Sequence, residues 1–239
     1  MHRFFVRRTG ENAAVLLPEE EAHALKVLRM KAGDPCQALL EGRAFSAWIT
    51  GVAPQVTVAL GEEMPSPEPS VRVTLYQGIP KGDKMDYIVQ KCTEAGISRI
   101  VPVAFSRCVA RWTEKDAEKK TARLQRISQE AAKQSGRALT PGICPPLSFG
   151  QLPEQLKSHE IIFVPWEEAR GKGVASYLAG QKDIALLIGP EGGISEEEMA
   201  FLQSLGAVPV TLGPRIFRTE TAGLAALVSI LTLTGDMGL

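Results

Sequence analysis

The sequence has few of the residues that build metal sites, disulfide frameworks and membrane spans. Its 239 residues include four cysteines and three histidines. The cysteines, at positions 36, 92, 108 and 144, form no C-x-x-C pair, so we expect neither a structural zinc nor a disulfide framework. The longest strongly apolar stretch, 222–233, is shorter than the roughly 20 residues that a membrane-spanning helix needs. No hydrophobic segment of signal-peptide length follows the N-terminus. We therefore expect a cytoplasmic protein with no metal and no membrane partner.

Net charge is also lacking, because 27 basic side chains balance 27 acidic ones. The distribution along the chain is nevertheless uneven. Residues 71–140 carry fourteen basic and seven acidic groups, and residues 1–33 carry six and four. This excess of positive charge fits binding to a phosphate backbone. A solvated helix face over 115–126 would explain part of it equally well.

A proline-rich stretch, EEMPSPEPS at 62–70, has the composition of a linker. The residues before it contain short apolar runs separated by turn signals and one helical pattern over 19–30, with apolar residues three apart. We therefore expect a first domain over 1–68, a small β-barrel with one helix. Its strands are expected near residue 16 and at 36–40, 45–50 and 56–60.

After the linker, strand patterns alternate with helix patterns, which predicts an α/β domain over 71–239. Its sheet would be mostly parallel and covered by helices on both faces. Ser195 followed by Glu198 forms a capping box at the start of one helix. The expected strands are 71–77, 97–103, 161–164, 184–189 and 208–213; the expected helices are 83–95, 113–135, 173–179, 195–205 and one from about 220.

Ligands of such sheets bind beyond the carboxyl ends of the strands. Three loops at these positions have unusual sequences: PWEEARGKG at 165–173, GPEGG at 189–193 and GPRIFRTET at 213–221. The glycines allow positive φ and a close approach of backbone to a ligand. Two plainer interpretations remain open: the GPEGG loop is a tight strand-to-helix turn, and Thr219 or Thr221 is the N-cap of the last helix.

Five segments together resemble one protein family. LLIGPEGGIS, LGPRIFRTETAGLAAL, KGDKMDYIVQKCTEAGI at 81–97, SRCV at 106–109 and KQSGR at 133–137 are similar to the bacterial 16S ribosomal RNA uridine-N3 methyltransferases of the SPOUT (α/β-knot) class. HRFFV near the start and HALKVLRMKAGD at 23–34 resemble the N-terminal PUA-like domain of that family. The resemblance implies a PUA-like β-barrel over 1–68 and, over 71–239, a SPOUT domain with a trefoil knot.

The resemblance also implies a cofactor, S-adenosylmethionine, bound in a bent conformation between three loops. Backbone groups would hold much of the adenine and ribose, which is a physical reason for the glycines. Carried over to this sequence, the cofactor-binding residues are Pro165, Trp166 and Glu167 in the first loop, Ile188, Gly189, Glu191, Gly192 and Gly193 in the second, and Leu212, Gly213, Ile216, Phe217, Arg218 and Thr219 in the third.

The implied reaction is methyl transfer to N3 of a uracil ring. That nitrogen is a weak nucleophile until it loses its proton, so a base must lie near the methyl donor. Glu191 and Glu220 are the candidates, and Arg218 would stabilise negative charge on the uracil oxygens. Either carboxylate could instead cap a helix.

The implied partner is ribosomal RNA or the small ribosomal subunit. Candidate RNA contacts are Arg3, Arg7, Arg8, Lys26 and Arg29 in the first domain, and Lys81, Lys84, Arg107, Arg111 and Arg137 in the second. The last helix is apolar on nearly every face and must be buried; the resemblance implies a homodimer. Two alternatives stay open, an RNA-binding protein without catalysis and a methyltransferase acting on another RNA or base atom.

Overall fold

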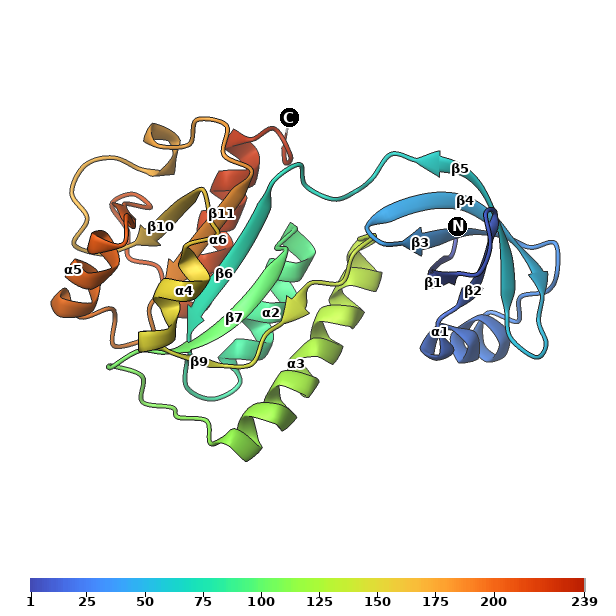
Figure 1. Cartoon of the computed structure of the whole chain (residues 1–239), viewed down its shortest axis with the longest axis horizontal. Helices are drawn as coiled ribbons and strands as arrows, with labels where there is room; N and C mark the ends of the chain where they lie inside the picture. The colour runs from blue at the N-terminus through green and yellow to red at the C-terminus, as the bar shows by residue number, and fades with distance from the viewer. Residues whose placement is uncertain (239) are drawn as a thin grey trace. The chain divides into compact units, whose positions relative to one another are not determined.

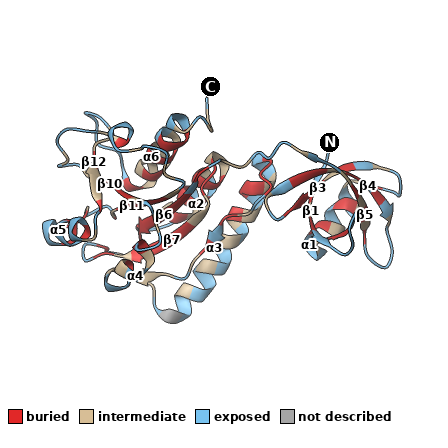
Figure 2. Ribbon diagram, turned by 45° about the horizontal axis from the view of Figure 1, so that its top comes forward, coloured by how far each residue is buried: buried red, intermediate tan, exposed pale blue. Residues whose placement is uncertain are grey.

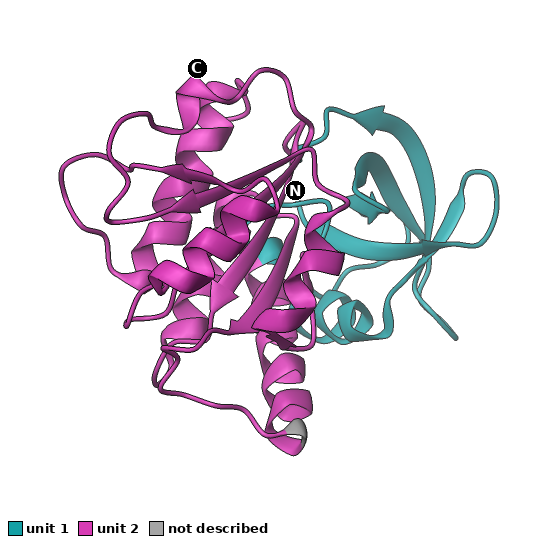
Figure 3. Cartoon of the chain, turned by 60° about the vertical axis from the view of Figure 1, so that its left-hand side comes forward, with its two compact units in different colours: residues 1–68, 132–139 teal, residues 69–131, 140–239 magenta. Residues whose placement is uncertain are grey.

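A computed structural model describes residues 1–238 except the side chain of Glu114, and these residues form two compact units (Figure 3). The first unit consists of residues 1–68 and 132–139, and the second begins at Pro69 and holds the remainder. The sequence had assigned 132–139 to the second domain. These residues group with the first unit because Glu68 binds them: its carboxylate accepts hydrogen bonds from Arg137 Nε at 3.1 Å and from the Ala138 backbone N–H at 2.7 Å.

The first unit is a closed barrel with the strand order β1-β2-β5-β4-β3, which confirms the expected architecture. β1 was not among the expected strands. In it, Phe4 and Val6 point into the barrel core while the arginines are exposed, and its parallel pairing with β3 closes the barrel. The strands are β1 (Arg3–Arg8), β2 (Ala13–Leu16), β3 (Pro35–Leu40), β4 (Arg43–Gly51) and β5 (Thr57–Met64).

The helix expected over 19–30 is shorter and irregular. It starts as α1 (Pro18–Ala22) and continues as the π-helical turn η1 (His23–Val27). Leu28 is its C-cap, and Arg29 takes a left-handed φ of 54°. A helix cannot continue through that conformation, so the pattern of apolar residues extends past the real end.

The second unit is built on a sheet with the order β12-β10-β11-β6-β7-β8, and β9 also pairs with β7 (Figure 1). Every pairing in it is parallel, as expected. The two-residue strands β8 and β9 are too short to leave a pattern in the sequence. The strands are β6 (Arg72–Gly78), β7 (Arg99–Ala104), β8 (Gly142–Ile143), β9 (Leu147–Ser148), β10 (Ile161–Pro165), β11 (Asp183–Ile188) and β12 (Val208–Val210).

Most helices of this unit lie where they were expected. The capping box is present, with Ser195 Oγ accepting from the Glu198 N–H at 3.2 Å, whereas the segment expected to be helical over 173–179 forms only a short 3-10 turn. The helical elements are α2 (Lys84–Ala95), α3 (Glu114–Ser135), η2 (Phe149–Gln151), α4 (Leu152–Leu156), η3 (Val174–Ser176), α5 (Glu196–Ser204) and α6 (Thr219–Leu233).

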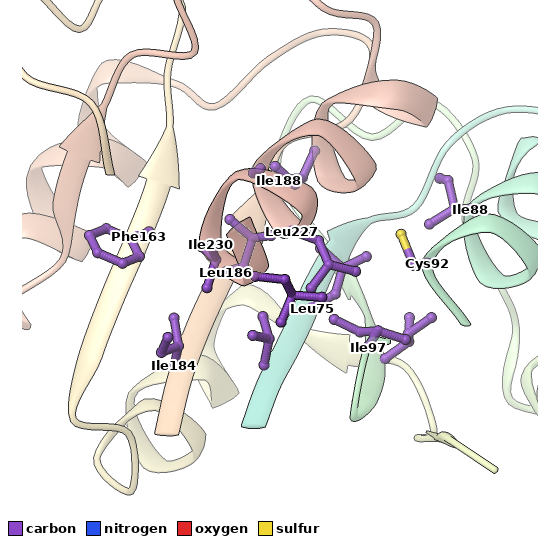
Figure 4. Close-up of a cluster of buried hydrophobic side chains, with 14 of the residues drawn as sticks. Leu75, Ile88, Cys92, Ile97, Phe163, Ile184, Leu186, Ile188, Leu227 and Ile230 are labelled. Carbon is purple, nitrogen blue, oxygen red and sulfur yellow. The ribbon is translucent and has the colours of Figure 1, made fainter. Parts of the chain in front are cut away.

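The central strands are buried on both faces, because a separate apolar core covers each face (Figure 2). One core joins Leu75 of β6 and Leu186 of β11 to Leu227 and Ile230 of α6 (Figure 4). The other holds Tyr76, the next residue of β6. This alternation explains why the strand sequences are apolar almost throughout.

Within residues 1–238, no helix is both long and apolar enough to cross a membrane. The same part of the chain contains no group of histidine, cysteine and acidic residues that could hold a metal ion.

Candidate active site

A cavity of about 820 Å³ lies at the carboxyl ends of β10, β11 and β12, in the size range of small-molecule sites. The three candidates for catalysis, Glu191, Arg218 and Glu220, line it, and so does Lys84. The expected cofactor-binding residues line it with one exception, Gly192; those that do are Pro165, Trp166, Glu167, Ile188, Gly189, Glu191, Gly193, Leu212, Gly213, Ile216, Phe217, Arg218 and Thr219.

Gly192 faces away from the cavity. A Cβ atom on it would lie 2.9 Å from Arg107 Cβ and 3.0 Å from Arg107 O, so this glycine is needed for the packing of the Arg107 backbone. The left-handed conformation expected of the loop belongs to Gly193, whose φ is 73°. Gly192 was expected to contact the cofactor; in the structure its small size serves the contact with Arg107.

A chain of hydrogen bonds joins the end of β6 to two of the cavity loops. Gln77 is fully buried, and its Nε2 donates to Thr219 Oγ1 at 2.9 Å. The Thr219 hydroxyl in turn donates to Gly189 O at 2.7 Å. Gln77 was not predicted from the sequence, because it lies at the end of a largely apolar strand. The one signal available was an amide side chain within an otherwise apolar segment.

Gly78, the next residue, allows the GPEGG loop to approach β6. A Cβ at this position would lie 2.4 Å from Pro190 N and 2.7 Å from the carbonyl carbon of Gly189. Two backbones therefore pass in direct contact, which only glycine permits. This residue was also missed, since nothing in a strand-terminal glycine distinguishes a close approach from a simple turn.

Lys84 lies between the two carboxylates. Its Nζ is 3.0 Å from Glu191 Oε1 and 3.3 Å from Glu220 Oε2. The hydrogen bond to Glu191, with the Glu220 carboxylate nearby, raises the pKa of Lys84. Lys84 was expected to contact RNA phosphate; the structure instead places it in the cavity, since the first turn of α2 points it at both acids.

The two carboxylates differ in their hydrogen bonding. Glu191 Oε1 also accepts from the Lys81 backbone N–H at 3.0 Å. Partial burial raises the pKa of Glu191, but these donors outweigh that effect and leave the pKa below its usual value. Glu220 Oε2, in contrast, is inaccessible to solvent and accepts no well-aligned hydrogen bond within the described residues. Glu191 is thus anchored by two donors, whereas the contact with Lys84 is the one ion pair of Glu220 among the described residues.

The third loop presents apolar and cationic groups at the same cavity. Ile216 is 80% exposed and Phe217 is 38% exposed, although both are apolar. Arg218 is exposed as well and is the N-cap residue of α6. The alternative that Thr219 or Thr221 caps this helix is therefore wrong, and the Thr219 hydroxyl is free to bind Gly189 O.

Most of the basic residues expected to contact RNA are on the surface, but Arg137 is buried. It is only 4% exposed, and its guanidinium binds the Glu68 carboxylate. Arg137 therefore cannot reach an RNA phosphate, and the expectation that it contacts RNA is wrong. Arg3 is exposed but donates to Gln37 Oε1 and Gly136 O. The other candidates are on the surface: Arg7, Arg8, Lys26, Arg29, Lys81, Arg107 and Arg111.

Comparison with known proteins identifies relatives for the whole chain. An RNA methyltransferase domain family matches residues 66–231. Ribosomal RNA small subunit methyltransferase E of Bacillus subtilis (strain 168) is 32% identical over 96% of both chains. The crystal structure of the protein with that name from Neisseria gonorrhoeae, bound to S-adenosyl methionine, is 30% identical over 98% of both chains with a TM-score of 0.82.

A second solved structure is also similar to this chain. It is a putative methyltransferase from Legionella pneumophila in complex with the bound cofactor SAM. The two are 31% identical over 96% of each chain, with a TM-score of 0.79. The likeness to both structures includes the barrel as well as the α/β unit.

Proposed function

The chain belongs to the RNA methyltransferase family that includes ribosomal RNA small subunit methyltransferase E, and we propose that it methylates N3 of a uridine in small-subunit ribosomal RNA. Its fold is of the SPOUT class, and S-adenosylmethionine is its methyl donor. The coarser function, methylation of small-subunit ribosomal RNA, follows from the family. The observation that supports methylation at N3 of uridine in particular is the cluster of Lys84, Glu191 and Glu220 at the wall of the cavity.

The cavity residues fit this cofactor. Ile216 and Phe217 offer apolar surface to a flat base, and the loops at Gly189 and Gly213 bring backbone groups to the cavity wall. Glu191 and Glu220 place negative charge where a sulfonium would be attracted. S-adenosylmethionine supplies an electrophilic methyl group. Its removal by exhaustive dialysis would therefore leave the fold intact and the activity absent.

We assign the role of proton acceptor to Glu220. Glu191 is held by Lys84 and the Lys81 N–H and its pKa is lowered, which makes it a weaker base than a free carboxylate. Glu220 contacts Lys84 through Oε2, but its side chain is 20% exposed and lines the cavity, where its other oxygen can accept a proton. The N3 proton passes to Glu220, the N3 electron pair forms the bond to the methyl carbon, and the carbon–sulfur bond breaks with its electrons on sulfur.

Two cations support this step. Lys84 favours the ionised form of Glu191, whose pKa is lowered. Arg218, exposed at the same cavity, stabilises the negative charge that develops on the uracil oxygens once N3 is deprotonated. Both roles need a substrate that enters from the side of the third loop.

We also propose a homodimer. On α6, Ala226, Leu227, Ile230 and Leu231 are buried within the chain, but Leu233 is 49% exposed, and Leu224 and Val228 are only half-buried. These residues leave apolar surface on α6 for a second copy. The surface arginines and lysines of the barrel and of the α/β unit would hold the RNA backbone.

Single-turnover methylation of small-subunit RNA by Glu220→Gln and Glu191→Gln tests the assignment. Glu220→Gln should lower the rate by about 10²-fold or more with cofactor affinity nearly unchanged. Glu191→Gln should mainly weaken cofactor binding, because the GPEGG loop loses the ion pair that joins Glu191 to Lys84. Normal turnover by Glu220→Gln would remove this base from the mechanism.

Mass analysis of digested RNA tests the methylated atom. The expected product is N3-methyluridine, and a methyl group on another atom would contradict the proposal. A protein that binds RNA but gives no signal in a calorimetric titration with S-adenosylmethionine would be an RNA-binding module without catalysis.

A further inference from the structure

A second cavity, of about 1210 Å³, lies in the same unit as the first. It is bounded by the loop 104–112, one face of α3 over 117–125 and the segment 143–149. Among the residues discussed for cofactor or RNA, only Arg111 lines it. Its walls are mainly apolar and include the aromatic rings of Phe105, Trp112 and Phe149. The cavity is thus separate from the site of methyl transfer.

Few polar groups of this cavity are available to a ligand. Glu198 lines it, but its two oxygens already accept from the Ser106 N–H at 2.7 Å and the Ser195 N–H at 3.0 Å. Thr121 Oγ1 is inaccessible to solvent and has no hydrogen-bond partner within residues 1–238. Arg111 is exposed and forms no ion pair in that part of the chain. A ligand would meet mainly apolar walls, the hydroxyls of Ser106 and Thr121, the exposed Glu118 carboxylate and the Arg111 guanidinium.

The surroundings carry positive charge. Residues 106–126 include seven lysines and arginines and three acidic residues, of which the exposed Glu118 is on the cavity rim. Lys120 Nζ lies 4.9 Å from the ring centre of Trp112. The loop that bounds the cavity also touches the cofactor loop, because Arg107 packs on Gly192 and donates to its carbonyl at 3.3 Å.

We propose that this cavity binds an unstacked nucleobase of the substrate RNA, in addition to the target uridine; this rests on the proposed function. A base is a flat ring with apolar faces and a polar edge, which matches aromatic walls with few polar groups. The Thr121 hydroxyl turns into the cavity to bind the base edge, and Arg111 binds the adjoining phosphate. A free apolar metabolite would explain neither Arg111 nor the basic segment around the cavity.

The test uses the full-length protein and single-stranded RNA hexamers of uridine and of adenosine as probes. Thr121→Val should weaken hexamer binding about fivefold or more, because one hydrogen bond to the base is lost. It should not destabilise the fold, since it removes an unpaired buried hydroxyl. Trp112→Leu should weaken binding about tenfold. Thr232→Val, which removes an exposed hydroxyl on α6, is the matched control and should bind normally.

Cofactor titrations of the same variants separate this proposal from the proposed function. S-adenosylmethionine affinity should be unchanged in all three. If the wild-type protein methylates RNA while Thr121→Val and Trp112→Leu bind hexamers normally, the nucleobase site is wrong and the function stands. A change of oligomeric state in these variants at unchanged RNA affinity would show that the cavity instead receives a second copy of the chain, and would also overturn the proposal.

Discussion

The amide nitrogen of Gln77 lies 2.9 Å from the hydroxyl of Thr219, and this hydrogen bond ties the central strand of the sheet to the start of α6. Its direction is determined by chemistry. The same nitrogen donates to the carbonyl of Gly78 at 3.0 Å, and a carbonyl can only accept, so the amide cannot be flipped. The Thr219 hydroxyl donates its only proton to Gly189 O, so it must accept the hydrogen bond from Gln77. The loop at Gly189 is therefore held by a buried strand.

Replacing Gln77 by Leu removes both donated hydrogen bonds and should weaken S-adenosylmethionine binding about tenfold, measured by calorimetric titration. Thr219→Ser should bind nearly normally and Thr219→Val should resemble Gln77→Leu. Thr221→Val is the control, because the Thr221 hydroxyl donates only to Arg218 O, three residues earlier at the start of α6. Wild-type affinity in both Gln77→Leu and Thr219→Val would contradict a positioning role for this chain.

Gly78→Ala should displace the GPEGG loop, because the added methyl group overlaps Pro190 N. We expect cofactor affinity to fall at least tenfold and the melting temperature to drop. Gly142→Ala, where the new methyl group would have no neighbour within 4 Å, should behave like the wild type. An unchanged affinity in Gly78→Ala would mean that the loop can move without harm to the site.

The pKa shifts of Lys84 and Glu191 predict how the site responds to pH. Because the pKa of Glu191 is lowered in the folded protein, its stabilising effect is complete above its unfolded value of about 4.3 and is lost as pH falls through the folded pKa. The raised pKa of Lys84 has the opposite sense: its contribution is complete below about 10.4 and is lost as pH rises through the folded pKa.

The melting temperature should therefore be constant between about pH 5 and pH 10 as far as this pair is concerned. Glu191→Gln should reduce the fall of the melting temperature at acid pH, because this variant has no carboxylate to protonate at position 191. An equally large fall in Glu191→Gln would show that other groups cause the loss of stability in acid.

Glu68→Ala should destabilise the first unit strongly. It leaves the Arg137 side chain, which is 5% exposed, without its carboxylate partner. Loss of one member of such a buried pair costs about 3–5 kcal/mol, measurable by urea denaturation. Glu154→Ala breaks the Lys157 pair, whose side chains are 71% and 78% exposed, and should cost less than about 1 kcal/mol. Equal effects would mean that Glu68 and Arg137 are better solvated than the structure indicates.

Local patterns predicted much of this fold. The alternation of strands and helices after residue 70, the capping box at Ser195 and the stop at Gly96 all depend on neighbours in sequence, and each is present. The failures have physical reasons as well. β1 carries three arginines, which hid its two buried positions, Phe4 and Val6. The helical segment cannot extend past Leu28, because Arg29 has a positive φ that an arginine does not signal in the sequence.

The sequence by itself determined the two-part architecture and the three loops that line the cavity, and its resemblance to a known family indicated the class of reaction, methylation of ribosomal RNA. Only the tertiary structure decided which side chains share that cavity. It placed Lys84 between two acids from other segments, turned Gly192 toward Arg107, buried Arg137 on Glu68, and set Gln77 and Gly78 under the loop. Contacts of this kind join residues about 70 to 140 positions apart, and no local periodicity or turn chemistry records which distant segments the sheet order brings together.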